Sequence, residues 1–257
     1  MRLIRFNSDG QAAYGLLKDN TVYTLDGSPF ESFTSGDAVG SIDDIELLAP
    51  CQPSKIVAIG RNYVAHAKEH QSEVPKEPLM FLKPPSAIIA HKQSIVRPPQ
   101  SGQVEHEGEL AVVIGKLAKN VRDLDAWAHV LGVTCANDVT ARDLQRSDGQ
   151  WSRAKGFDTF CPLGPWIETE LSLEEIDALH IECRVNGTVR QSGQCGDMVF
   201  KIPRLIAYIS AAMTLEPGDV ILSGTLAGVS QLNAGDVVEV EIDRLGVLRN
   251  GVKQPES

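Results

Sequence analysis

The sequence has few cysteines, no long apolar run and no excess of basic residues, and each absence excludes a class of protein. The five cysteines are odd in number and scattered without a C-x-x-C pair, so we expect reduced thiols and neither a disulfide framework nor a zinc site. The most apolar long segment, Leu205 to Leu215, is too short to span a bilayer, and the first nine residues lack the apolar core of a signal peptide. We therefore expect a cytoplasmic protein.

The charge balance excludes polyanionic partners. The formal net charge is −10, whereas phosphate-rich partners require basic patches on a protein surface. We therefore expect neither nucleic acid nor an anionic membrane as a partner. With 257 residues, 42% of them hydrophobic, the chain can bury one large core plus a small appendage. The sequence shows no internal repeat and no low-complexity segment.

Turn residues divide the sequence into two predicted domains, residues 1–50 and residues 51–257. The first is a small β-rich domain with short strands over residues 3–6, 13–17 and 21–25. In the second, strand-like runs dominate, and we expect helices over residues 123–130, 139–146 and 203–213. Periodicity alone predicts a β-rich α+β fold, and the Gly-Asp turns before alternating strands suggest a compact antiparallel roll or barrel.

Three acidic residues stand beside apolar runs, where solvated charges are unusual. Glu107 and Glu109 precede an apolar run that ends at Gly115, and Asp138 closes a second such run. Alternate residues of a strand face one side about 7 Å apart, so Glu107 and Glu109 aim at one point, and Asp138 completes a triangle if the two strands are neighbours. Converging carboxylates repel one another unless a cation neutralises them.

We therefore hypothesise a divalent-metal site. An all-oxygen, anionic ligand set suits Mg²⁺ or Mn²⁺, with Ca²⁺ as a third candidate, whereas Zn²⁺ would recruit His or Cys. The competing interpretation is a solvated pair on an edge strand, because Glu-x-Glu pairs are common there. Glu239 and Glu241 form such a pair on an alternating strand, and we assign no metal to them.

Two further candidates for chemistry are a His–Glu pair and a lysine. His66 and Glu69 are three residues apart, hence on one helical face, and a carboxylate that orients an imidazole is the simplest water-activating dyad. The alternative is a surface ion pair, and the polar segment suits a mobile lid as well as a fixed helix. Lys155 lies before a glycine- and proline-rich loop and could stabilise a developing negative charge in a dry site, although most lysines are simply solvated. We expect Cys135 and Cys161 to be buried packing residues and not nucleophiles.

Between residues 55 and 252, seven motifs occur in the order seen in the fumarylacetoacetate hydrolase family, which the sequence therefore resembles. They are Gly60-Arg61-Asn62-Tyr63 with His66 and Glu69; Phe81-Leu82-Lys83-Pro84; His106-Glu107-Gly108-Glu109-Leu110; Asn137-Asp138-Val139-Thr140-Ala141-Arg142-Asp143; Lys155-Gly156-Phe157-Asp158; Asn186-Gly187; and Pro217-Gly218-Asp219-Val220-Ile221 with Gly224-Thr225.

The resemblance implies a mixed β-sandwich roll with a small N-terminal β domain, assembled as a homodimer or, in some members, a tetramer. It implies a divalent metal, usually Mg²⁺ or Mn²⁺, on Glu107, Glu109 and Asp138, and His66 and Glu69 as the water-activating dyad on a lid. On the same basis Lys155 and Thr225 contact the substrate, and we add Arg61 and Tyr63 as substrate-binding candidates. Arg142 is kept only as a structural or substrate-side charge.

The resemblance further implies a small 2-oxo or dicarboxylic acid substrate and a metal-stabilised enolate. Our first choice is Mg²⁺-dependent hydrolysis of a carbon–carbon bond in an acylpyruvate. The alternatives are 2-hydroxyhepta-2,4-diene-1,7-dioate isomerase or decarboxylase, and oxaloacetate decarboxylase or tautomerase. A metal-binding scaffold without activity is disfavoured, because a scaffold needs neither the dyad nor the lysine.

One loop departs from the family pattern. The family usually has G-T-P-x-G-V-G, whereas this sequence has Leu226 in place of the proline and Ser230 in place of the last glycine. Proline fixes φ and glycine permits positive φ, so we expect this loop to have a different shape or more freedom.

Overall fold

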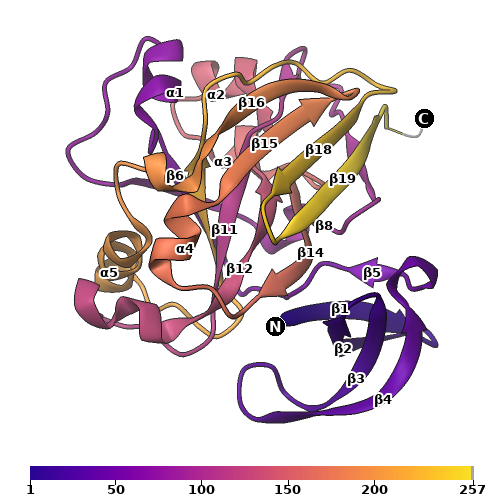
Figure 1. Cartoon of the computed structure of the whole chain (residues 1–257). Coiled ribbons are helices and arrows are strands. Elements are labelled where there is room, and N and C mark those ends of the chain that lie inside the picture. The colour runs from indigo at the N-terminus through magenta and orange to yellow at the C-terminus, as the bar shows by residue number, and fades with distance from the viewer. Residues whose placement is uncertain (256–257) are drawn as a thin grey trace.

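The computed structural model describes residues 1–255, which form two large β-sheets with the α-helices on the side away from the N-terminal strands (Figure 1). The strands of the first fifty residues are β1 (Arg2–Ser8), β2 (Gln11–Lys18), β3 (Thr21–Gly27), β4 (Phe33–Ser41) and β5 (Leu47–Leu48). The later strands are β6 (Ile56–Gly60), β7 (Leu79–Lys83), β8 (Ile88–Ile89), β9 (Ser94–Val96), β10 (Val104–Glu105), β11 (Gly108–Ile114), β12 (Val130–Asn137), β13 (Thr140–Ala141), β14 (Cys161–Glu168), β15 (His180–Val185), β16 (Thr188–Gln194), β17 (Val220–Thr225), β18 (Val237–Ile242) and β19 (Gly246–Lys253). The α-helices are α1 (Val64–Glu69), α2 (Arg142–Ser147), α3 (Ser152–Gly156), α4 (Leu173–Ala178) and α5 (Ile202–Ala212), and the 3₁₀ helices are η1 (Ile42–Asp44), η2 (Pro85–Ala87), η3 (Asp123–His129) and η4 (Cys195–Asp197).

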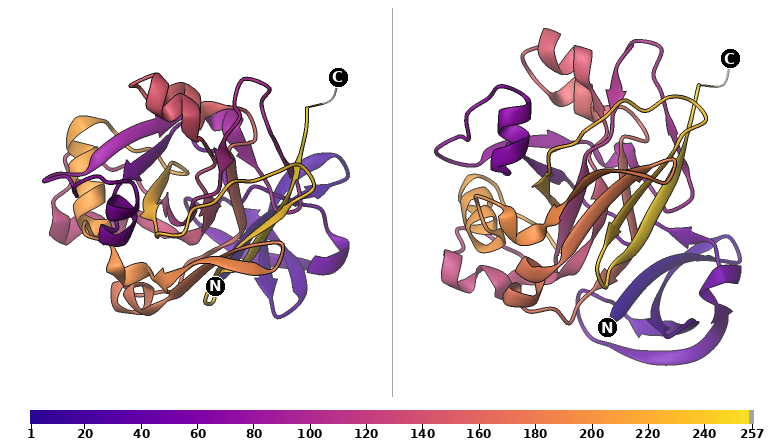
Figure 2. Two further views of the ribbon diagram at one scale, coloured as in Figure 1. Left: turned by 90° about the horizontal axis from the view of Figure 1, so that it is seen from above. Right: turned by 45° about the horizontal axis from the view of Figure 1, so that its top comes forward.

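The larger sheet contains twelve of the described strands and joins the N-terminal strands to the rest of the chain. Ten of them follow the order β4-β3-β2-β1-β14-β12-β11-β17-β6-β7, while β5 pairs with β1 and β8 with β14. The smaller sheet has the order β16-β15-β18-β19-β9, and β10 pairs with β13. Figures 1 and 2 show the N-terminal strands gathered at one side of the molecule and α1 at the opposite side. The predicted β-rich α+β fold is confirmed, and the domain boundary at residue 50 stays a prediction.

Strand β11 lies at the centre of the large sheet and divides its side chains between two hydrophobic clusters. Leu110, Val112 and Ile114 belong to the larger cluster, which includes residues of the smaller sheet and of α5, whereas Ala111 and Val113 belong to the second cluster. Because successive side chains of a strand point to opposite faces, both faces of β11 are covered. Its first residues are therefore fixed in a dry part of the molecule.

The predicted helices are found with two corrections. The helix expected over 203–213 is α5, but the one expected over 123–130 consists of 3₁₀ turns, η3. The helix expected over 139–146 begins only at Arg142, because Thr140 and Ala141 form strand β13 opposite Glu105 and Val104.

All five cysteines are buried and free. Burial raises the pKa of Cys161 to about 12 and that of Cys135 further, so both thiols stay protonated near neutral pH, as expected of packing residues and not of nucleophiles. Among the described helices, none combines the length and the apolar composition that crossing a bilayer requires.

Asp219 links the starts of the neighbouring strands β17 and β6. Its carboxylate accepts hydrogen bonds from the backbone N–H of Ser54 (2.9 Å), Lys55 (3.1 Å) and Glu216 (2.7 Å), and it forms an ion pair with the Lys55 ammonium. Burial alone raises the pKa of Asp219, but these donors outweigh it and hold the pKa below its ordinary value.

We predict that Asp219→Asn lowers the free energy of unfolding by about 2–4 kcal/mol, because an amide can accept at only one atom and its NH₂ group then faces N–H donors. The matched control is Asp236→Asn in the second Gly-Asp turn, where we expect about 1 kcal/mol. Since the folded-state pKa of Asp219 is depressed, the loss of unfolding free energy in Asp219→Asn should be complete above about pH 4. It should shrink as the pH falls through the folded-state pKa of Asp219. Urea unfolding at several pH values measures it, and a difference that grows towards low pH would contradict the assignment.

Candidate active site

The three predicted acids converge where strands β11 and β12 meet. The two strands are antiparallel, with Gly108 opposite Asn137, and the Asp138 N–H donates to the Glu107 carbonyl at 2.8 Å. One carboxylate oxygen from each of Glu107, Glu109 and Asp138 lies within 4.8 Å of the others, and all three residues are buried. The structure therefore places these acids in the triangle that the sequence predicts, and not on a solvated edge.

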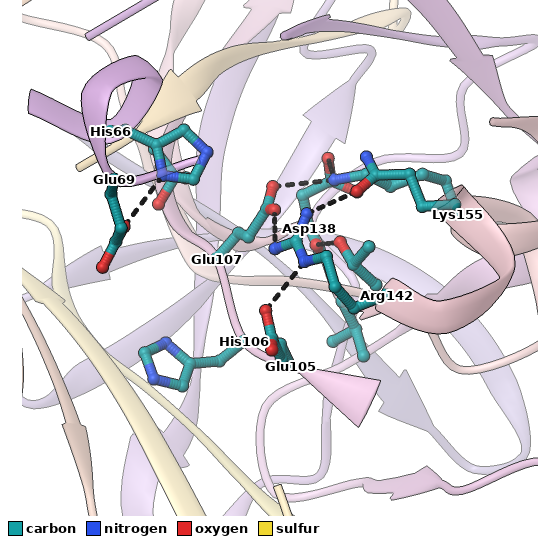
Figure 3. A network of polar contacts seen from close by, with 12 residues as sticks. His66, Glu69, Glu105, His106, Glu107, Asp138, Arg142 and Lys155 are labelled. Atoms are coloured by element: carbon teal, nitrogen blue, oxygen red, sulfur yellow. Dashed lines mark hydrogen bonds and ion pairs between the residues drawn. The ribbon is translucent and has the colours of Figure 1, made fainter. Parts of the chain in front are cut away.

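Three buried cations surround this acid cluster, which we define as Glu107, Glu109 and Asp138. Lys155 on α3 donates to Glu107 at 2.7 Å and to Asp138 at 2.6 Å. Arg142 on α2 donates from Nη2 to the other Glu107 oxygen at 2.6 Å (Figure 3). Glu107 and Asp138 are therefore fixed in position by charge-assisted hydrogen bonds.

Lys83, at the end of β7, is a member of the site that the sequence reasoning missed. Its side chain is fully buried, and its Nζ donates to the other Asp138 oxygen at 2.6 Å and to the Lys155 carbonyl at 2.5 Å. The motif Phe81-Leu82-Lys83-Pro84 was the available signal, since a lysine that ends an apolar strand before a proline is unusual.

The protonation of the cluster is asymmetric. Burial alone raises the pKa of Glu107, but Lys155 and Arg142 outweigh it and hold the pKa well below its ordinary value. Burial, and to a smaller extent repulsion from Asp138 and Glu107, raises the pKa of Glu109 well above its ordinary value. Within residues 1–255, the only hydrogen bond to the Glu109 carboxylate comes from the Gly224 N–H, at 2.7 Å. Without a further cation, burial and the two neighbouring carboxylates therefore favour the neutral form of the Glu109 carboxyl.

This donor set fits a hard divalent cation. A carboxylate oxygen that accepts one hydrogen bond retains acceptor capacity, so Glu107 and Asp138 can still coordinate an ion. Glu109 is a buried carboxyl beside two negative charges and is stabilised as an anion only if positive charge is added nearby. An all-carboxylate set favours Mg²⁺ or Mn²⁺.

His66 and Glu69, both on α1, line a cavity that the acid cluster also lines. The His66 Nδ1 lies 3.4 Å from a Glu69 carboxylate oxygen (Figure 3). Burial lowers the pKa of His66, so its ring is neutral at pH 7 and can accept a proton. The Glu69 carboxylate also accepts the backbone N–H of Gly228 at 3.0 Å, which connects the helix to the loop that departs from the family pattern.

That loop is held by several contacts. The Thr225 hydroxyl donates to the Gly108 carbonyl at 2.8 Å and accepts from Gln191 at 2.7 Å, and the Gln191 amide also donates to the Leu226 carbonyl at 2.6 Å. The Ser230 hydroxyl lies 2.9 Å from the His106 Nε2. The structure therefore shows side-chain contacts at both ends of this loop, and a shape or freedom different from the family pattern stays a prediction.

The acid cluster and the dyad line one cavity of about 500 Å³. Arg61, Lys155 and Thr225 also line it, as predicted positions for substrate contact. Tyr63 does not: it is buried, and its hydroxyl donates to the Cys195 carbonyl at 3.3 Å, so we leave it out of the proposed substrate contacts. The lining residues that the sequence reasoning did not single out as site candidates are Ile59, Gly60, His70, Gln71, Ser72, Phe81, Gln145, Arg146 and Trp151.

Comparison with known proteins gives the family. The protein-family model described as fumarylacetoacetate (FAA) hydrolase C-terminal matches residues 55–253. A second family model, described as Rv2993c-like, N-terminal, matches residues 1–50. The chain is 49% identical over 219 residues to the mitochondrial oxaloacetate tautomerase FAHD2A of Homo sapiens, which covers 81% of this chain and 70% of that protein.

Two similar solved structures are isomerases by name. One is 5-carboxymethyl-2-hydroxymuconate delta-isomerase from Mycobacterium smegmatis, with 42% identity and a TM-score of 0.91 over 99% of this chain and 100% of that chain. The other is 2-hydroxyhepta-2,4-diene-1,7-dioate isomerase from Mycobacterium marinum, with 40% identity and a TM-score of 0.91 over 100% of both chains. By sequence and by structure, the chain belongs to the fumarylacetoacetate hydrolase family.

Proposed function

We propose that the protein is a Mg²⁺-dependent enzyme that interconverts the keto and enol forms of a small 2-oxo dicarboxylic acid, with oxaloacetate as the candidate substrate. The observation that carries the proposal is that a neutral imidazole, His66, lines the same cavity as a cluster of three carboxylates fit for a divalent ion. The oxaloacetate tautomerase of Homo sapiens, 49% identical over most of this chain, supports the choice of substrate.

The charges of the cavity suit a dianion. Four carboxylates and four cationic side chains line the cavity, so a bound divalent ion leaves a surplus of two positive charges. Among residues 1–255, Arg61 and Arg146 have no ion-pair partner. They are therefore the groups available to bind the carboxylate farther from the acid cluster.

The reaction needs a base and a stabilised negative charge. His66 accepts the proton from the carbon next to the 2-oxo group, and Glu69 orients the ring and stabilises its protonated form. Burial alone lowers the pKa of Lys155, but Asp138 and Glu107 outweigh it and raise the pKa above its ordinary value. Lys155 thus acts as a fixed positive charge and not as a base. Glu107, Glu109 and Asp138 would hold the Mg²⁺, which supplies Lewis-acid charge to the 2-oxo group.

Hydrolysis of an acylpyruvate is the second candidate. The His66–Glu69 pair has the composition of a water-activating dyad, which is why the sequence made hydrolysis the first choice. We place it second because the similar proteins described above are a tautomerase and two isomerases. Decarboxylation, homodimer assembly and a cytoplasmic location stay predictions.

A substrate panel tests the proposal. With Mg²⁺ present, we expect enol–keto conversion of oxaloacetate, followed by its ultraviolet absorbance, to exceed the rate with Mg²⁺ alone, and turnover of acetylpyruvate, fumarylpyruvate and 2-hydroxyhepta-2,4-dienedioate to be slower. Faster hydrolysis of acetylpyruvate would favour the second candidate. Absence of turnover with all four substrates would contradict the proposed function.

The Arg61→Ala variant tests the dianion preference. Loss of one charge-assisted hydrogen bond costs about 1.5–3 kcal/mol, so we expect KM for oxaloacetate to rise about 10- to 100-fold. KM for acetylpyruvate, which has a single carboxylate, should change little. The control is Arg204→Ala on α5, whose guanidinium stacks on Tyr208 outside the cavity. Equal effects of Arg61→Ala on both substrates would contradict a carboxylate contact.

A further inference from the structure

A second group of metal-ligand side chains lies on α1, separate from the acid cluster. His66, Glu69 and His70 each offer one ligand atom within 4.8 Å of the others. Their spacing of three and four residues places them on one helical face, and the His70 N–H donates to the His66 carbonyl at 3.3 Å, which continues the helical turn through His70. The two imidazole rings are 4.7 Å apart.

The distance between His66 Nδ1 and the Glu69 carboxylate matches the distance between two ligands of one metal ion. His66 has a side chain only 9% exposed, yet its Nδ1 has no hydrogen-bond partner within residues 1–255. A Glu69 oxygen is 3.4 Å away, which is long compared with a hydrogen bond of about 2.9 Å. Two ligands that each lie about 2.1 Å from a tetrahedral ion are about 3.4 Å apart.

The chemistry of the three ligands selects a different ion from the acid cluster. Two imidazoles and one carboxylate suit Zn²⁺, whereas three carboxylates suit Mg²⁺. The run His66-Ala67-Lys68-Glu69-His70 also has the H-x-x-E-H order of a class of zinc proteases, in which the two histidines bind the ion. Burial lowers the pKa of both His66 and His70, so neither ring must lose a proton to bind an ion at pH 7.

We propose that His66, Glu69 and His70 form a Zn²⁺ site, distinct from the acid cluster, and that Zn²⁺ bound there inhibits the enzyme. The binding follows from the ligand geometry alone. The inhibition rests on the proposed function: a neutral imidazole that coordinates an ion through Nδ1 carries its proton on Nε2 and cannot accept another there, and a carboxylate that coordinates the ion cannot orient the ring.

Binding is tested on the full-length protein kept in excess Mg²⁺, which occupies the acid cluster. Co²⁺ is the spectroscopic probe, because a four-coordinate site with imidazole ligands absorbs visible light strongly and an octahedral oxygen site absorbs weakly. We expect one equivalent of Co²⁺ to give this absorption and Zn²⁺ to displace it. His70→Ala should weaken Zn²⁺ binding by at least about 100-fold, whereas His180→Ala, at an exposed histidine on β15, should leave it unchanged.

The Glu109→Gln variant separates the two sites, because it removes an acid-cluster ligand and leaves α1 intact. Retention of the Co²⁺ absorption in Glu109→Gln is the expected result; its loss there, or equal Zn²⁺ affinity in the parent and His70→Ala, would overturn the proposal. Circular dichroism checks that His70→Ala folds.

Inhibition is measured relative to the zinc-free rate of each variant. Micromolar Zn²⁺ should inhibit the parent and the His180→Ala variant, and His70→Ala should require about 100-fold more. If the protein turns over no substrate of the panel, the proposed function fails while the binding measurement still decides the zinc site. Zn²⁺ binding without inhibition would remove the inhibitory role.

Discussion

Glu109→Gln should abolish tight Mg²⁺ binding and catalysis while leaving the metal-free protein as stable as the parent, or more stable. Glu109 is the member of the acid cluster whose pKa burial and its carboxylate neighbours raise well above the ordinary value. We therefore expect the parent side chain to be neutral in the metal-free protein at pH 7, where glutamine copies its charge and shape. With Mg²⁺ present the two differ, because only the carboxylate can ionise and coordinate the ion.

The sign of the pH dependence follows from the raised pKa. The unfolded chain loses the Glu109 proton near pH 4.3, about the ordinary value for glutamic acid, whereas the folded metal-free chain loses it only at a higher pH. The stability that this group contributes is present below about pH 4 and is lost as the pH rises towards its folded-state pKa. Glutamine cannot ionise, so the metal-free Glu109→Gln variant should lose less stability between pH 5 and pH 8 than the parent.

Calorimetry and thermal unfolding measure both halves of this prediction. We expect Mg²⁺ affinity to fall by at least about 100-fold, and added Mg²⁺ to raise the Tm of the parent but not of the variant. The control is Glu241→Gln on β18, which belongs to another alternating acid pair but forms an exposed ion pair with Arg184 at 2.7 Å. Undiminished Mg²⁺ binding in Glu109→Gln would remove it from the ligand set. A large loss of metal-free stability would contradict its neutral state.

The acid cluster was predictable because its signals are local. An apolar strand makes an adjacent carboxylate conspicuous, and strand periodicity gives the direction of Glu107 and Glu109. The remaining step was that the strand before Asp138 pairs with the strand after Glu109, and the register of β11 and β12 confirms it. The helix that bears His66 and Glu69 was predictable from their spacing and from the helix formers between them.

The contacts that fix the site were not predictable, because they join residues far apart in the chain. Lys83 donates to Asp138 across 55 positions, and Glu69 accepts from Gly228 across 159. The motif around Lys83 makes the lysine conspicuous, but it does not show which groups the ammonium contacts. The placement of Tyr63 away from the cavity depends in the same way on a partner, Cys195, far along the chain.

The choice of reaction is not specified by the three carboxylates. Tautomerisation, hydrolysis and decarboxylation of a 2-oxo acid all need a stabilised negative charge and a group that transfers a proton, so the acid cluster serves each equally. The reactions differ in whether His66 takes a proton from the substrate carbon or from a water molecule. They also differ in the number of carboxylates on the substrate that Arg61 and Arg146 would bind. The dyad variant and the Arg61→Ala variant therefore carry more information about the reaction than any ligand variant does.

His66→Ala should lower kcat about 10²- to 10⁴-fold with little change in Mg²⁺ affinity, because the variant removes the proposed base but no ligand of the acid cluster. The parent ring is neutral since burial lowers its pKa, so kcat of the parent should fall as the pH drops below the folded-state pKa and protonates the ring. The variant has no such group and should lose this acid limb. Glu69→Gln keeps the base but removes the charge that stabilises its protonated form, so we expect a smaller loss, about 10- to 100-fold.

The control for this comparison is His129→Ala, at a half-buried histidine that ends η3 and whose ring contacts the Leu117 carbonyl; its kcat and pH profile should match the parent. Steady-state rates across pH, with calorimetry of Mg²⁺ on the same samples, separate loss of the base from loss of the ion. If His66→Ala retains the parent rate, proton transfer belongs to another group. If it loses Mg²⁺ binding as well, the imidazole supports the acid cluster rather than the substrate, and the boundary drawn here between dyad and metal ligands is wrong.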